Sequence, residues 1–237
     1  MSDYRIERAR DTDALARGAA EWIAAQISLV LDQRDRCSIA LSGGSTPARA
    51  YSLLGQERLP WDRVDVVLGD ERWVAADDSS SNARMLRQTL MGDGPGSAAV
   101  FHPAPTVELS DAEASASALA EVVGRLCSGD PPVFDVMVLG LGDDGHTASL
   151  FPGTEATTVT DCWATVGRGK GLDRITLTAP VLSAAREVMF LVSGSAKRQA
   201  LQRLVDPQES PLRTPAKLVS PAKQVLILAD QDAASRL

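Results

Sequence analysis

Short apolar runs alternate with longer segments of helical periodicity along this chain. The runs have the length and composition of strands buried on both faces of a parallel sheet. They cover residues 37–41, 64–68, 134–139, 188–192 and 225–228. Between them, apolar side chains recur every three or four positions, as on the buried face of an amphipathic helix. This helical pattern is clearest over residues 11–33, 48–54, 83–91 and 111–126.

Further along the chain, residues 162–166 and 174–177 are expected to form two strands joined by a Gly/Lys turn, and a helix is expected to end the chain. Strands that alternate with helices predict one α/β domain over residues 1–237. The expected fold is doubly wound and Rossmann-like, with a mostly parallel sheet and helices on both faces.

Composition and charge narrow the possible ligands. The formal net charge of −7 argues against binding to nucleic acid or to an anionic membrane. An anionic substrate therefore requires a local cluster of Arg and Lys. No signal peptide is evident, and no apolar run approaches transmembrane length. Three widely spaced cysteines (Cys37, Cys127 and Cys162) are expected to be reduced, which favours a cytoplasmic protein.

The segment from residue 134 to residue 153 combines a predicted buried strand with a cluster of polar residues. Gly140, Gly142 and Gly145 are interleaved with Asp143, Asp144 and His146. Ligands of open α/β sheets bind beyond the carboxyl ends of the strands, where this cluster would lie. A lone histidine is more often structural, but the glycine-rich and acidic setting makes His146 the first candidate for a general base. His102, between Phe101 and Pro103, is expected to be structural.

A second polar turn follows the predicted strand at residues 37–41. Gly43 and Gly44 allow a ligand to approach the backbone, and Ser45 or Thr46 can cap the helix expected after Pro47. A strand, a small polar turn and a helix start together form an anion site. The segment lacks the Gly-Lys-Ser/Thr ending of a Walker loop and the Gly-x-Gly-x-x-Gly dinucleotide fingerprint. Unless this is an ordinary strand-to-helix turn, the sequence favours the phosphate of a small sugar.

Charged residues follow other predicted strands. Asp70 and Arg72 lie at the end of the strand at residues 64–68, where they are either site residues or part of a solvated charge run. Lys197 lies in a turn that repeats the arrangement at residues 42–47, and Arg174 begins a predicted strand. Arg174 and Lys197 are the cations expected to meet a phosphate.

Taken together, these segments resemble the 6-phosphogluconolactonase family, part of a wider group that includes glucosamine-6-phosphate deaminases. The matching segments are residues 41–47, 69–74 with 81–82, 140–153, 174–178 and 190–194 with Lys197 after it. The resemblance implies hydrolysis of 6-phospho-D-glucono-1,5-lactone to 6-phosphogluconate, the second step of the oxidative pentose phosphate pathway. It also implies a Rossmann-like sheet and no cofactor or required metal. The expected partner is a small sugar-phosphate lactone, and the expected assembly is a monomer or small homo-oligomer.

The residues support a mechanism in which His146 takes a proton from water that attacks the lactone carbonyl. Either Asp144 or Asp70 could orient His146, and Arg72 could stabilise the developing negative charge. Phosphate binding is assigned to Gly43, Gly44, Ser45 and Thr46, with Arg174 and Lys197. A Ser42 nucleophile is less favoured because the residue is not in a Gly-x-Ser-x-Gly elbow. The Asp143-Asp144-x-His146 cluster lacks a further ligand at metal-binding spacing.

Two other functions compete with lactone hydrolysis. Related deaminases continue Gly-His with Ile-Ala-Phe-Asn-Glu, whereas this chain continues with Thr147-Ala-Ser-Leu-Phe151 and lacks that carboxylate. A sugar-phosphate sensor of the kind found in transcription regulators would need a DNA-binding module, and the segment before Asp11 is too short to form one.

Overall fold

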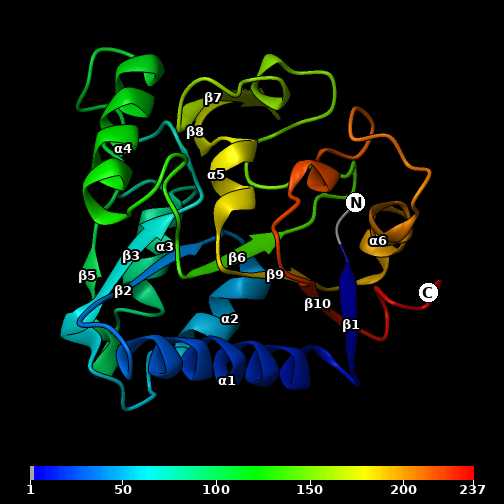
Figure 1. Ribbon diagram of the computed structural model, residues 1–237, viewed down its shortest axis with the longest axis horizontal. Helices are drawn as coiled ribbons and strands as arrows, with labels where there is room; N and C mark the ends of the chain where they lie inside the picture. Colours follow the sequence, from blue (N-terminus) through cyan, green and yellow to red (C-terminus); the bar gives the residue numbers. More distant parts are fainter. Residues whose placement is uncertain (1–2) are drawn as a thin grey trace.

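The computed structural model describes residues 3–237, and within them seven strands form one parallel sheet (Figure 1). In spatial order the strands are β1 (Tyr4–Ala9), β10 (Val225–Asp230), β9 (Glu187–Val192), β6 (Val136–Gly140), β2 (Cys37–Leu41), β3 (Val64–Leu68) and β5 (Val100–Phe101). The five strands expected from apolar runs are all present in this sheet. The predicted α/β fold with a mostly parallel sheet is confirmed.

Helices cover both faces of the sheet (Figure 1), as predicted. One face packs against α1 (Thr12–Leu31), α2 (Ser45–Leu54) and α3 (Asn82–Gln88). The other face packs against α4 (Ala112–Leu126), α5 (Ala179–Ala184) and α6 (Arg198–Val205). Short 3₁₀ helices lie at Trp61–Arg63 (η1), Pro95–Ala98 (η2), Glu155–Thr157 (η3), Ser195–Lys197 (η4) and Pro215–Leu218 (η5).

Side-chain caps fix where two of the helices begin. Asp11 accepts a hydrogen bond of 2.7 Å from the backbone N–H of Ala14 at the start of α1, and Asp111 does the same for Ala114 at the start of α4. Each carboxylate satisfies one of the N–H groups that a helix leaves unpaired, and its charge is favourable at the positive end of the helix dipole.

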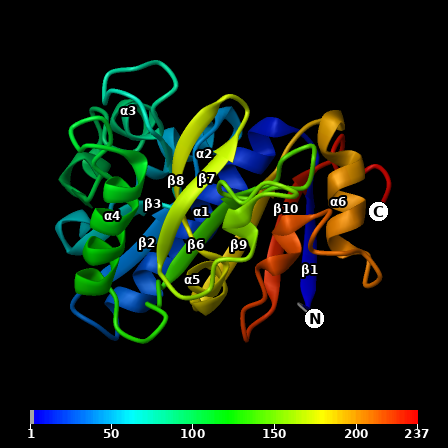
Figure 2. The same ribbon diagram turned by 90° about the horizontal axis from the view of Figure 1, so that it is seen from above.

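A small antiparallel sheet lies over one face of the main sheet (Figure 2). It consists of β4 (Asp70–Arg72), β8 (Leu172–Leu177) and β7 (Ala164–Gly169), in that order. The hairpin of β7 and β8 was expected, although β7 begins two residues later than predicted. The strand at residues 70–72 was not expected, because three charged residues read as a loop. It forms because each of these residues pairs with one on β8.

The two ends of the chain differ from what the sequence predicted. β1 was not predicted, since its central residues are mostly charged and exposed, as is typical of a strand at the edge of a sheet. The expected C-terminal helix is a series of turns after Asp230.

The helix α1 bears on the expectation that no apolar run approaches transmembrane length. It is 20 residues long and apolar enough to pass as a membrane span by length and composition. Its apolar face is instead buried against the sheet, as in any helix that covers a core.

The chain order of the strands creates a switch point between β2 and β6. From β2 the chain passes through α2 to β3 on one side, and from β6 it passes through α5 to β9 on the other. Because α2 and α5 lie on opposite faces of the sheet, the loops after β2 and β6 separate. Open α/β sheets bind ligands in the crevice that this separation leaves.

Candidate active site

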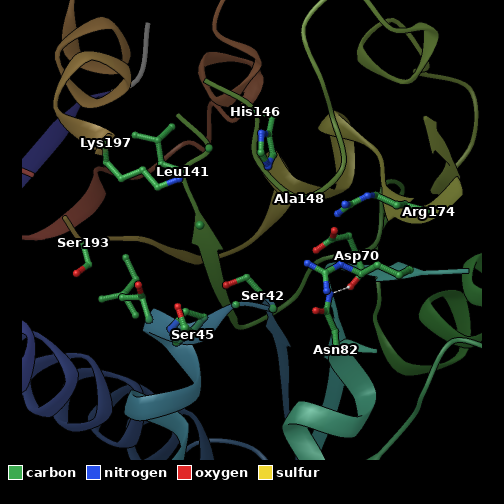
Figure 3. A pocket seen from close by; sticks show the side chains of 18 of the residues that line it. Ser42, Ser45, Asp70, Asn82, Leu141, His146, Ala148, Arg174, Ser193 and Lys197 are labelled. Carbon is green, nitrogen blue, oxygen red and sulfur yellow. Dashed lines mark hydrogen bonds between the residues drawn. The ribbon is translucent and has the colours of Figure 1, made fainter. Parts of the chain in front are cut away.

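A cavity of about 270 Å³ lies at this switch point, beyond the carboxyl ends of β2, β3, β6 and β9 (Figure 3). It is lined by Ser42, Gly43, Gly44, Ser45, Thr46, Pro47, Asp70, Arg72, Asn82, Gly140, Leu141, Gly142, His146, Ala148, Lys170, Arg174, Leu191, Ser193 and Lys197. Every residue predicted for the site therefore lines one cavity, with the exception of Asp144.

Asp144 lies behind His146 and contacts its ring. The Oδ1 atom of Asp144 is 2.5 Å from Nδ1 of His146 and also accepts a 3.0 Å hydrogen bond from the His146 backbone N–H. The ring packs against Phe151 with a centroid separation of 4.4 Å. With the carboxylate on Nδ1, the proton of neutral imidazole is held there and Nε2 is left as the basic nitrogen. Asp144, and not Asp70, is the carboxylate that contacts the imidazole.

The tight turn between β6 and His146 makes this contact possible. The backbone N–H of Gly142 donates to the carbonyl of His146 over 2.8 Å, and the N–H of Gly145 donates to the carbonyl of Gly142 over 3.0 Å. A Cβ atom on residue 142 would lie 2.0 Å from Nδ1 of His146. Only glycine leaves room for the imidazole at this position.

Burial and charge act in opposite directions on this pair. Burial lowers the pKa of His146 below its ordinary value of 6.5, and the hydrogen bond and charge of Asp144 offset only part of that effect. For Asp144, burial acts to raise the pKa, but the hydrogen bonds from the backbone and ring of His146 outweigh it and the pKa is lowered. Near neutral pH the pair is therefore a neutral imidazole beside a carboxylate, as a general base requires.

Two arginines on one side of the cavity form no salt bridge within residues 3–237. Arg72 on β4 and Arg174 on β8 are directly paired in the antiparallel ladder. The Nε atoms of both are buried and have no hydrogen-bond partner within residues 3–237. Burial, and then the charge of Arg72, lowers the pKa of Arg174. The guanidinium of Arg174 stacks over Phe151, 5.3 Å from the ring centroid. These features are typical of an anion-binding site.

Asp70 lines the cavity near Arg174 (Figure 3). Its Oδ2 atom accepts a 2.6 Å hydrogen bond from the hydroxyl of Ser149, and its backbone carbonyl accepts one of 2.9 Å from the amide of Asn82. The first bond fixes the direction of the carboxylate and the second fixes the backbone of the residue, so Asp70 presents a rigid carboxylate to a ligand.

The start of α2 lies across the cavity. The helix begins at Ser45, earlier than the expected start after Pro47, and Gly44 is its N-cap residue with a φ of 116°. Ser45 and Thr46 therefore occupy the first helical turn instead of capping it. Their backbone N–H groups have no partner within the helix and are free for a ligand. Lys197 lines the same side of the cavity (Figure 3).

The predicted phosphate contacts are divided between these two sides. Figure 3 shows Lys197, Ser193 and Ser45 on one side of the cavity, with the end of the Lys197 side chain near Leu141, whereas Arg174 lies near Asp70 on the opposite side. The two cations thus approach a ligand from opposite directions. The structure also adds residues that sequence reasoning did not select, namely Ser42, Asn82, Lys170 and Ser193 in the lining and Ser149 behind Asp70. Ser149 and Asn82 fall inside the motifs quoted above, but only the fold shows that they hold Asp70.

His102 lies apart from the cavity, as expected. Its Nε2 atom is 2.8 Å from the carboxylate of Asp65, a residue of β3 that also binds Arg36. Among the described residues, no three His, Cys, Asp or Glu side chains are grouped so as to hold a metal ion.

A rigid carboxylate, a histidine–carboxylate pair and unpaired cations at the switch point of an open sheet define an α/β protein that acts on small anionic ligands. Residues 10–228 match the family described as glucosamine-6-phosphate isomerases/6-phosphogluconolactonase. The chain belongs to this family.

Individual relatives agree with this assignment. A 6-phosphogluconolactonase of Synechocystis sp. is 40% identical over 94% of each chain, and one of Nostoc sp. is 37% identical over 98% of each. Among solved structures, the 6-phosphogluconolactonase of Trypanosoma brucei superposes with a TM-score of 0.89, at 29% identity and over 100% of both chains.

Proposed function

We propose that this protein hydrolyses 6-phospho-D-glucono-1,5-lactone to 6-phospho-D-gluconate, the second step of the oxidative pentose phosphate pathway. The observation that carries the proposal is the 2.5 Å contact between Asp144 and Nδ1 of His146 at the wall of a cavity with unpaired cations. The relatives are named 6-phosphogluconolactonases, which supports the choice of substrate.

In this reaction, Nε2 of His146 takes a proton from a water molecule as its oxygen attacks the C1 carbonyl of the lactone. The resulting tetrahedral intermediate carries a negative oxygen, which the Arg72 guanidinium stabilises. When the bond between C1 and the ring oxygen breaks, the imidazolium of His146 returns the proton to that oxygen. Asp144 keeps the imidazole in the correct tautomer throughout.

The two sides of the cavity divide the binding of the substrate. The phosphate binds at the start of α2, where it meets the N–H groups of Ser45 and Thr46 and the ammonium of Lys197. Arg174 contributes positive charge from the other side, next to Arg72. Asp70 accepts hydrogen bonds from sugar hydroxyl groups.

Water is favoured over serine as the nucleophile. The hydroxyl of Ser42 is buried and has no hydrogen-bond partner in the described part of the chain, so no base contacts it. A strained lactone is also reactive enough that an acyl-enzyme is not required.

The test is the decay of freshly generated lactone with wild-type protein, with His146→Ala and with His102→Ala, after subtraction of the spontaneous rate. Loss of the base should lower kcat by about 10²–10⁴-fold. The His102 variant is the matched control, because the chain contains only these two histidines and His102 is bonded to Asp65 away from the cavity.

Each result has a definite meaning. Acceleration by wild type and by His102→Ala, but not by His146→Ala, supports both the reaction and its base. Acceleration that survives in His146→Ala contradicts the mechanism, and no acceleration by wild type contradicts the function. Glucosamine 6-phosphate should release no ammonia, since release would favour the deaminase reaction instead.

A further inference from the structure

Asp230, the last residue of β10, is a buried carboxylate that none of the roles above uses. The residue is only 3% exposed. Its carboxylate accepts hydrogen bonds from the Ser193 hydroxyl (2.6 Å) and the backbone N–H groups of Gly194 (3.0 Å) and Ala233 (2.8 Å). Because a buried charge is costly without such donors, Asp230 depends on the geometry of the turn that it binds.

That turn connects Asp230 to Lys197 through two hydrogen bonds. The N–H of Gly194 donates to Asp230, and the carbonyl of Gly194 accepts a 3.0 Å hydrogen bond from the N–H of Lys197. Gly194 has a φ of 90°, in the left-handed region, and is the N-cap residue of η4. The direction of the Lys197 side chain therefore depends on the hydrogen bonds that fix the position of Gly194.

A second contact supports the same segment. The Nε atom of Arg198, the first residue of α6, donates to the backbone carbonyl of Asp232 over 2.7 Å. Residues 193–198 are therefore tied at two points to the end of β10 and the turn that follows it.

The start of α2, on the same side of the cavity, is held in a comparable way. The hydroxyl of Tyr51, a fully buried residue, donates to the carbonyl of Ser42 and accepts from its N–H, at 3.2 and 3.1 Å. Both turns that bring groups to the proposed phosphate site are thus anchored by a buried polar side chain from outside the turn.

We propose that Asp230 is a positioning residue that holds the turn of residues 193–197 so that the Lys197 ammonium faces the phosphate at the start of α2. This inference rests on the proposed function, in that the ligand carries a phosphate at this place. A turn that is already ordered loses less conformational entropy when the ligand binds, so the same ionic contact yields a higher affinity.

The experiment is a double-mutant cycle between Asp230→Ala and Lys197→Ala. Binding of 6-phosphogluconate and of inorganic phosphate is measured by calorimetry, and KM and kcat are measured for the lactone. Asp230→Asn keeps an oxygen that accepts from Gly194 and Ala233 and should bind nearly as well as wild type. Asp135→Asn is the matched control, because Asp135 is equally buried but binds Arg34 and Arg186 before β6, at the other end of the sheet.

Loss of the Lys197 ammonium should weaken binding by about 10- to 100-fold, as expected for one charged hydrogen bond. Asp230→Ala should weaken it by about tenfold and raise KM far more than it lowers kcat. In the double variant, binding should be within about twofold of Lys197→Ala alone, because Asp230 acts only through Lys197. Asp135→Asn should lower the unfolding temperature without changing KM.

Several outcomes would overturn the inference. They are wild-type binding by Asp230→Ala, effects that multiply in the double variant, and wild-type protein that does not bind phosphate at all. If Asp230→Ala does not fold, Asp230→Ser is measured instead, since it keeps one acceptor oxygen. Wild-type protein that binds phosphate with the expected coupling but does not hydrolyse the lactone would contradict the proposed function and leave the role of Asp230 supported.

Discussion

Arg72 and Arg174 lie directly opposite each other in the antiparallel pair of β4 and β8, and both line the cavity. Like charges in this arrangement repel, and the buried Nε of each guanidinium has no hydrogen-bond partner in the part of the chain that the structure describes. The arrangement is unfavourable in the free protein and becomes favourable when an anion binds between or beside the two groups. The repulsion between the two arginines lowers the stability of the free protein, and its relief by a bound anion strengthens binding.

Replacing Arg174 by Met should separate these two effects. We expect KM for the lactone to rise about tenfold or more. The free energy of unfolding should stay unchanged or increase by roughly 1 kcal/mol, because a buried guanidinium that forms no salt bridge among the described residues is replaced by an apolar side chain of similar length. Enzyme kinetics and urea denaturation measure the two quantities.

The control for this substitution is Arg168→Met on the neighbouring strand β7. Arg168 is exposed, binds Glu113 and does not line the cavity, so KM should not change. An unchanged KM in Arg174→Met, together with a loss of stability, would show that Arg174 is structural.

The pH dependence of the rate should report on His146. Only neutral imidazole can act as the base, and burial lowers its pKa below 6.5. The value of kcat/KM should therefore be constant around pH 7 and fall as the pH decreases through this lowered pKa. The measurement is the rate between pH 4.5 and 7.5, with spontaneous hydrolysis subtracted.

Asp144→Asn should move this acidic limb to still lower pH. The charge of Asp144 raises the pKa of His146, so its removal lowers that pKa further. The plateau should also fall, by about 10²-fold or more, because the amide no longer fixes the tautomer. A limb that moves to higher pH, or does not move, would contradict the assignment of Asp144 as the partner of His146.

The sequence could predict the local parts of this structure. The apolar runs that form β2, β3, β6, β9 and β10 identified the sheet, because strands buried on both faces need continuous apolar residues. The family resemblance named the residues of the cavity. His146 and Asp144 are two positions apart, but sequence alone left Asp70 as an alternative because only the turn geometry brings one carboxylate to Nδ1.

The long-range relationships could not be predicted in this way. Arg72 and Arg174 are about a hundred positions apart and meet only because β4 pairs with β8. Asp230 reaches Gly194 because β10 and β9 are neighbours in the sheet. Neither pairing follows from apolar periodicity: β4 is short and charged, and the apolar runs that identify β9 and β10 do not say that these strands are neighbours. Strand order therefore determines which polar residues support the site.

Gly142→Ala should abolish most of the activity while leaving ligand binding largely intact. The added Cβ atom would lie 2.0 Å from Nδ1 of His146 and 2.6 Å from Oδ1 of Asp144, so the imidazole must move. A displacement of about 1 Å can cost about 10²-fold in rate. Binding of 6-phosphogluconate should change little, because the start of α2 and Lys197 are not affected.

Gly18→Ala is the matched control, since its Cβ would make an ordinary 3.5 Å contact with Leu228. In the helix α1, this change should stabilise the protein by up to about 1 kcal/mol without altering the rate. Full activity in Gly142→Ala would mean that the position of His146 is not critical, and the general-base mechanism would have to be abandoned.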